Sequence, residues 1–129
     1  MERAEAERLL ATCALHVYLG LELVEWDEGR VAFRFVPPAI ARTGEGTPLH
    51  GGALAAVLDT AATFAVISSI GQDASTVDLR VDFLRPALDP ELRVEGRTTR
   101  AGRRFAFADA TVTAADGRLV ASGRGTFTW

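Results

Sequence analysis

Cysteine is almost absent from this sequence, and lysine is absent altogether. The single cysteine, Cys13, cannot form a disulfide within the chain, which favours a reducing, cytoplasmic setting over an oxidising, secreted one. All 14 basic residues are arginines and the formal net charge is −3, which argues against a protein whose main partner is a nucleic acid. The first residues are charged and lack the basic-then-apolar order of a signal peptide.

Other absences narrow the organisation of the chain and its chemistry. The sequence has no linker, low-complexity tract or internal repeat, so we expect a single domain over residues 1–129. No Ser-His-Asp set, Cys-His set, metal-ligand cluster or phosphate loop stands out, so we expect no metal and no separate cofactor. One apolar run, Gly51–Ile70, approaches the length of a membrane span. It contains Asp59, which is costly at mid-bilayer, so we expect no membrane segment.

The first third of the chain predicts a helix and a hairpin. Residues 2–17 place apolar side chains at helical intervals opposite Glu and Arg, which is typical of an amphipathic helix. From Leu19 to Phe35 the pattern changes to alternation around a turn at Asp27–Gly29, which predicts a β-hairpin.

The rest of the chain predicts one long helix and four strands. Residues 37–50 form an irregular connection, and Gly51–Ile70 reads as a long helix that ends at the following glycine. The period then returns to two, first in "STVDLRVDFLRP" and then in three strands with turns near Ala101–Gly102 and at Asp116–Gly117.

The order of these elements predicts the fold class. Helical and strand runs are segregated, which indicates an α+β protein with an antiparallel sheet. The helix over residues 51–70 is apolar nearly all round and must be covered on most sides. We therefore expect a curved six-stranded sheet wrapped around it. The two open edges of such a sheet invite pairing with another copy of the chain, so we expect a dimer that continues the sheet.

Two glycines mark the start of the long helix. His50, Gly51 and Gly52 lie where the loop becomes the helix. The first N–H groups of a helix have no internal partner, and glycine lets another group approach them closely. This arrangement is suited to an oxyanion hole. An ordinary glycine-rich helix start is the alternative reading.

Asp59 is a carboxylate in the middle of this apolar helix. A buried charge is costly unless it is compensated, and Thr63 lies one turn later on the same face. Asp59 is therefore a tuned base, a solvated residue, or a structural residue capped by Thr63. Gly52 and Asp59 are about 10 Å apart along the helix, so one subunit can hardly present both to one carbonyl group. The helix of a second subunit could close that gap.

Four later residues and one earlier one are weaker candidates. Thr76 and Asp78 belong to the strand after the long helix, and Asp78 could be an ordinary polar-face residue. Arg103 and Arg104 follow a turn and could hold a phosphate, or form an ordinary solvated pair. His16 lies at the end of the first helix, where a structural role is the usual one, and we assign it no function.

Three segments of the chain resemble the PaaI-type acyl-CoA thioesterases of the hotdog fold. They are "LHGGALAAVLDTAATFA", "TVDLRVDFLRPA" and "GRLVASGRGTF", and the resemblance covers the chain from about Leu19 to its end. It implies a hotdog fold, a dimer with a shared sheet that often pairs again into a tetramer, and active sites at the dimer interface. It also implies an acyl-CoA thioester substrate, with coenzyme A present only as part of that substrate.

The resemblance also implies roles for individual residues. Asp59 matches the catalytic carboxylate, which acts as general base or nucleophile, and Gly51 matches the residue of the opposite subunit whose N–H polarises the thioester carbonyl. His50 matches the motif histidine near the sulfur. Thr76 matches a hydroxyl that orients the water, and Thr63 matches a threonine of one related branch. The candidate substrate-binding residues are Gly52, Thr47, Asp78, Arg103 and Arg104.

One departure from the family pattern keeps other functions open. Many members carry Asn or Gln six residues before the motif histidine, where this chain has Gly44; Thr43, Glu45 or Thr47 could substitute. We expect an enzyme that hydrolyses acyl-CoA to free acid and CoA. The alternatives are a hotdog enoyl-CoA hydratase or dehydratase and a non-catalytic acyl-CoA-binding protein.

Overall fold

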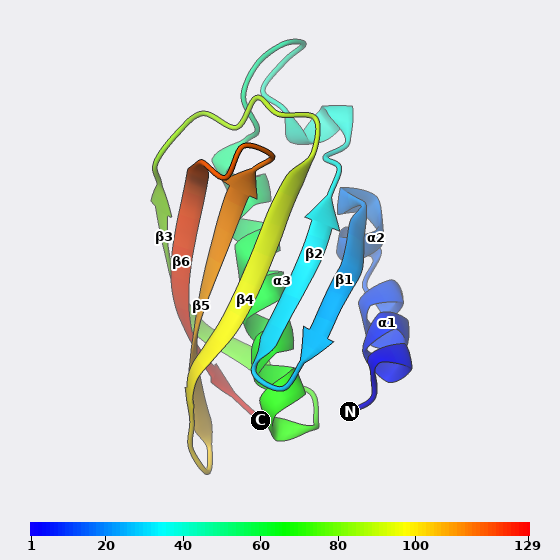
Figure 1. The fold of residues 1–129 in the computed structure, drawn as a ribbon, viewed down its shortest axis with the longest axis vertical. Coiled ribbons are helices and arrows are strands. Elements are labelled where there is room, and N and C mark those ends of the chain that lie inside the picture. Colours follow the sequence, from blue (N-terminus) through cyan, green and yellow to red (C-terminus); the bar gives the residue numbers. More distant parts are fainter.

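The computed structural model describes residues 1–129 and shows one antiparallel sheet that curves around one long helix (Figure 1). The strand order is β1-β2-β4-β5-β6-β3, and every neighbouring pair is antiparallel. The expected α+β hotdog architecture is therefore confirmed. The strands are β1 (Leu21–Asp27), β2 (Arg30–Phe35), β3 (Ser75–Phe83), β4 (Leu92–Ala101), β5 (Phe105–Ala114) and β6 (Leu119–Thr128), and a short 3₁₀ helix spans Ala39–Ala41.

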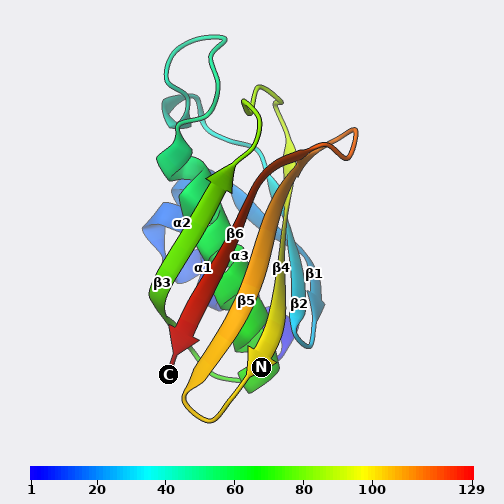
Figure 2. The ribbon, with the colours of Figure 1, turned by 90° about the vertical axis from the view of Figure 1, so that its left-hand side faces the viewer.

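The long helix, α3 (Gly51–Ile70), has the bounds that the sequence predicts. It ends at Gly71, which adopts the left-handed conformation at φ 74° that favours glycine after a helix. By length and composition alone this helix could cross a membrane, but more than half of it is buried inside the protein. Figure 2 shows the sheet curving around it, so α3 is the core helix of the fold.

Small residues on the inner face of the sheet let α3 approach closely. The inward-facing residues of β5 include Ala106, Ala108 and Ala110, all of them buried. On the neighbouring strand β4, a Cβ added to Gly96 would overlap the carbonyl oxygen of Ala61. Only glycine fits there without displacing the helix, so this position sets how deeply α3 lies in the sheet.

The N-terminal segment differs from its prediction. We expected one helix over residues 2–17, whereas the structure has α1 (Arg3–Thr12) and α2 (Ala14–Leu19), separated by an extended Cys13. The Thr12 hydroxyl donates to the Leu9 carbonyl, a local bond that competes with helix continuation.

The start of the first strand also differs from its prediction. Leu19 ends α2 instead of starting the hairpin, because Gly20 turns the chain at φ 71°. The alternation of leucines therefore runs across a helix end, and β1 begins only at Leu21.

Strand β3 forms an open edge of the sheet. It pairs with β6 alone, and a bulge lies between Thr76 and Asp78. Val77, which lies at the bulge, and Phe83, at the end of the strand, are 54% and 56% exposed. Exposed apolar side chains on an edge strand promote association, and native proteins usually cover such an edge or place charges on it. This edge is therefore suited to contact with another chain.

Candidate active site

The start of α3 presents one free backbone donor. His50 caps the helix, and its Nδ1 accepts a hydrogen bond of 2.9 Å from the Gly52 N–H. Gly51 is the first helical residue, so its N–H has no partner within the helix, and it donates to no loop or side-chain group either. The cap therefore satisfies Gly52 and leaves the Gly51 N–H at the positive end of the helix dipole.

A hollow of about 390 Å³ lies beside this donor, and Gly51, Leu54 and Phe83 are among the residues that line it. A Cβ on Gly51 would lie 3.2 Å from Phe83 Cζ, so glycine keeps the approach to the backbone open. This geometry suits a carbonyl oxygen that gains negative charge.

The Asp59 carboxylate is held by a strand. Thr76 Oγ1 donates a hydrogen bond of 2.8 Å to Asp59 Oδ1, and it joins the second residue of β3 to the middle of α3. Thr63, which the helical spacing makes the nearest hydroxyl, donates no hydrogen bond to Asp59. The other carboxylate oxygen, Oδ2, accepts no hydrogen bond from the chain and is available to a water or a substrate.

Asp59 is half-buried, so part of its hydration is retained. Gly51 and Asp59 lie about 12 Å apart along the helix axis, and the hollow beside Gly51 does not include Asp59. A single chain therefore presents the donor and the carboxylate at two separate places on α3.

His16, to which we assigned no function, packs against the same helix as Asp59. It comes from α2, and its ring packs edge-on against Phe64 of α3, with centroids 6.0 Å apart. Its Nδ1 is buried without a hydrogen-bond partner. Burial lowers the pKa of His16, and the Leu10 backbone and the negative charge of Asp59 partly offset that effect. Sequence spacing carries no signal of this contact with Phe64, because it depends on how α2 folds against α3.

The structure places two of the candidate substrate-binding side chains away from Asp59. The Thr47 hydroxyl is used inside its own loop, where it donates to the Gly44 carbonyl and accepts from Thr43 Oγ1. Asp78 lines a hollow on the sheet with Arg80 and Arg124.

Arg103 and Arg104 are exposed in the β4–β5 turn and form no ion pair. They are therefore free to meet a negatively charged group, and the turn projects beyond the end of the sheet (Figure 1).

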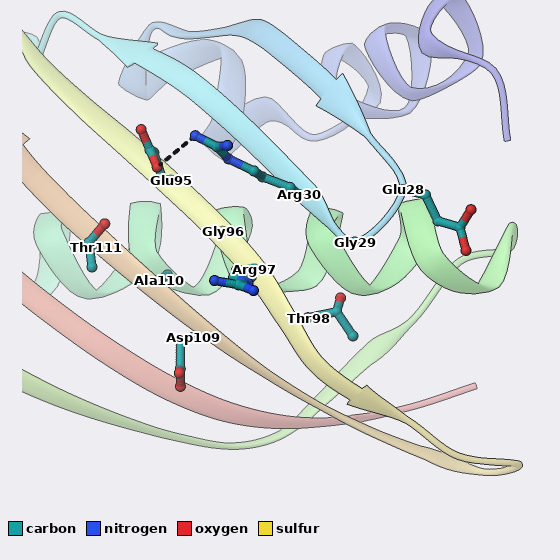
Figure 3. Close-up of a pocket in the computed structure, with 10 residues that line it drawn as sticks. All are labelled: Glu28, Gly29, Arg30, Glu95, Gly96, Arg97, Thr98, Asp109, Ala110 and Thr111. Atoms are coloured by element: carbon teal, nitrogen blue, oxygen red, sulfur yellow. Dashed lines mark ion pairs between the residues drawn. The ribbon is translucent and has the colours of Figure 1, made fainter.

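The largest hollow, about 770 Å³, lies on the outer face of the sheet, with α3 behind it (Figure 3). Arg30 Nη2 lies 3.7 Å from Glu95 Oε2 there, and the Arg124 guanidinium lowers the pKa of Asp109. These charged side chains already pair with one another, so they are ordinary surface ion pairs and do not indicate a ligand. No group of three His, Cys, Asp or Glu side chains converges in a way that could hold a metal ion.

Comparison with known proteins identifies the family. The model of the Thioesterase superfamily matches residues 48–121, a stretch that contains Gly51, Asp59, Thr76 and the β4–β5 turn. The chain belongs to this superfamily. The thioesterase is 30% identical to the medium/long-chain acyl-CoA thioesterase YigI of Salmonella typhimurium over 84% of its own length and 81% of that protein.

Solved structures agree with this assignment. The Escherichia coli PaaI protein from the phenylacetic acid degradation operon superposes with a TM-score of 0.88 at 25% identity, over 97% of this chain and 90% of that one. The Streptococcus mutans protein smu.793, bound to acetyl CoA, superposes with a TM-score of 0.77 at 25% identity, over 84% and 86%. The protein is therefore a PaaI-like thioester hydrolase.

Proposed function

We propose that this thioesterase hydrolyses acyl-CoA thioesters and that Asp59 activates the attacking group. The observation that carries the proposal is the Asp59 carboxylate, held at one oxygen by Thr76 and free at the other, in an otherwise uncharged helix. The names of the YigI relatives and the acetyl CoA bound to the Streptococcus mutans protein support acyl-CoA as the substrate class.

The proposed reaction uses the two half-sites together. Asp59 Oδ2 takes a proton from a water molecule, whose oxygen attacks the thioester carbon. The carbonyl oxygen becomes an oxyanion and accepts a hydrogen bond from the free Gly51 N–H. When the tetrahedral intermediate collapses, the carbon–sulfur bond breaks and CoA leaves as a thiol, with the proton that Asp59 had accepted. Direct attack by the carboxylate would use the same residues. The resemblance to PaaI-type proteins implies that the exposed His50 ring lies near the thioester sulfur.

The separation of the half-sites supports a shared active site. Because Gly51 and Asp59 are about 12 Å apart in one subunit, the donor in each site comes from a second subunit. The open edge of β3, with its exposed Val77 and Phe83, is the surface through which two sheets would join. Pairing of two such dimers into a tetramer follows from the resemblance to PaaI-type proteins, and the single cysteine supports a cytoplasmic setting.

The β4–β5 turn is the proposed contact for the CoA phosphates. The turn that carries Arg103 and Arg104 leads into β5. The first residue of β5, Phe105, lies two strand spacings from Ser75 at the start of β3, because β6 pairs with both strands. Two spacings are about 10 Å, which brings the guanidinium groups near the end of β3 that holds the carboxylate. Arginine binds phosphate in a bidentate fork.

The test is thiol release from a panel of acyl-CoAs by the parent protein and by Asp59→Asn. We expect the parent to release CoA from at least one acyl-CoA and the variant to lose nearly all turnover, with an unchanged melting temperature, because an amide cannot accept the proton. Equal rates in both proteins would refute the mechanism. Hydration of an enoyl-CoA without thiol release, or tight acyl-CoA binding without turnover, would refute the proposed activity.

A further inference from the structure

Arg42 binds three backbone carbonyl groups and no carboxylate. Its Nη1 donates to the Thr47 and Ala87 carbonyl oxygens at 3.3 and 3.1 Å, and its Nη2 donates to the Asp89 carbonyl oxygen at 2.8 Å. It forms no ion pair with an acidic side chain. A charged donor makes stronger hydrogen bonds than a neutral one, and the planar guanidinium fixes its acceptors at set angles. The half-buried Arg42 side chain therefore joins two separate segments of the chain.

The first segment is the loop before α3, and the second is the connection between β3 and β4. The connection is anchored to the sheet, because the Leu84 and Arg85 N–H groups both donate to the Val120 carbonyl oxygen of β6. The loop closes on itself, where Arg42 and Leu49 form an isolated antiparallel bridge. Both segments lie at the end of the sheet where α3 begins (Figures 1 and 2). The arginine therefore ties the loop to the sheet.

Two backbone hydrogen bonds carry this tie to the proposed oxyanion donor. The Leu49 N–H donates at 3.0 Å to the Ala87 carbonyl oxygen, which also accepts from the guanidinium. The His50 N–H donates at 2.8 Å to the Ala41 carbonyl oxygen, at the other end of the loop. These bonds hold the two residues that precede Gly51, so they set the direction of its N–H.

The same two segments form the walls of the hollow beside Gly51. Pro48 and Leu49 line it from the loop, and residues 84–87 line it from the connection. An oxyanion donor is effective only when it is held in place before the reaction, and a small misplacement lowers the rate steeply. The separation of these walls therefore decides how well a carbonyl oxygen in the hollow meets the Gly51 N–H.

We propose that Arg42 is a positioning residue for the Gly51 N–H. Its guanidinium fixes the loop against the connection, so that the donor faces the hollow. It acts on this part of the site alone, because Thr76 of β3 holds the Asp59 carboxylate. This inference rests on the proposed function, in which the Gly51 N–H stabilises the oxyanion.

The first test is amide hydrogen exchange followed by NMR, which needs no activity. Arg42→Met keeps the apolar stem and removes every donor. Arg3→Met is the matched control, because Arg3 also donates to two backbone carbonyl groups, in β1 at the opposite edge of the sheet from β3. We expect exchange at the Leu49 and His50 amides to rise about tenfold or more in Arg42→Met alone. Unchanged exchange at both amides in that variant would overturn the inference.

The second test is a double-mutant cycle in kcat for thiol release. Arg42→Met should lower kcat about tenfold with KM little changed, which is part of the factor of about 10²–10³ that one oxyanion donor contributes. Gly51→Pro has no N–H to position, so adding Arg42→Met to it should lower kcat no further. Thr76→Val acts on the carboxylate instead, so its effect and that of Arg42→Met should multiply. Arg3→Met should keep the kcat of the folded protein.

The outcomes separate this inference from the proposed function and from a purely structural role. A kcat loss in Arg42→Met that only matches its loss of folded protein would overturn the inference. The same fold-loss in the Gly51→Pro background as in the parent would overturn it too. If the parent releases no thiol from any acyl-CoA, the proposed activity fails, and hydrogen exchange still decides whether Arg42 holds the start of α3.

Discussion

Replacing Gly51 with proline would remove the proposed oxyanion donor and little else. Proline has no N–H, and it is favoured at the first position of a helix, where that N–H has no helical partner. The preceding residue, His50, has φ −60° and ψ 135°, a conformation that a following proline permits. The Gly51 N–H donates to no group of the chain outside the helix. Gly51→Pro should therefore fold and keep α3.

The expected magnitude follows from the chemistry of one donor. Loss of an oxyanion-hole donor costs about 10²–10³ in kcat, or about 2.7–4 kcal/mol. The steric effect needs a control. The added ring meets Phe83, whose Cζ is 3.2 Å from the site of a new Cβ. Phe83 lies on the edge through which we propose that two sheets join, and Gly51→Ala adds the same Cβ beside it, so the melting temperatures and rates of the two variants are compared with each other.

The assay is steady-state thiol release with the best acyl-CoA, run beside Gly51→Ala. The alanine variant adds the same Cβ and keeps the N–H, so its kcat should stay within about threefold of the parent. A kcat for Gly51→Pro equal to that of Gly51→Ala, with both proteins folded, would refute the role of this N–H.

Mixing inactive variants tests whether the site is shared. In a dimer of one Asp59→Asn subunit and one Gly51→Pro subunit, one of the two sites keeps both its carboxylate and its donor. Unfolding and random reassociation of equal amounts should therefore restore about a quarter of the parent activity. No recovery, with mixed dimers present, would place both residues of each site in the same subunit.

Three further predictions concern the groups around these residues. Thr76→Val should lower kcat about tenfold and Thr76→Ser should restore it, because the hydroxyl orients the carboxylate through a charge-assisted hydrogen bond; unaltered rates in Thr76→Val would contradict this. Gly96→Ala should lower the free energy of unfolding in urea by about 3 kcal/mol or more, since the Cβ overlaps the backbone of α3. Gly44→Ala, where the Cβ would make only ordinary contacts, should leave it unchanged. His50→Ala should cost about 1 kcal/mol in the same assay, because the Gly52 N–H loses its cap. Full stability in His50→Ala, or an equally large loss of stability in His50→Asn, would show that the cap contributes little.

Local sequence patterns account for most of the fold. The bounds of α3 follow from an apolar run between two glycine-marked ends, and the turn at Asp116–Gly117 follows from its dipeptide; both signals are read over a few residues. The two details that were wrong, the break at Cys13 and the helical Leu19, lie at helix ends. There the energy differences are small and side-chain bonds compete with the helix.

The candidate site also depends partly on local sequence pattern and partly on tertiary packing. The sequence alone determined which residues can do chemistry, since the two glycines after His50 and the carboxylate in an apolar helix are visible in the order of residues. It pointed to Thr63 as the partner of Asp59, because helical neighbours four residues apart are the only contacts that spacing reveals. Tertiary structure decided that Thr76 holds the carboxylate and that His16 packs against Phe64 of the same helix. Those contacts join segments far apart in the chain, and only the packing of β3 and α2 against α3 brings them together.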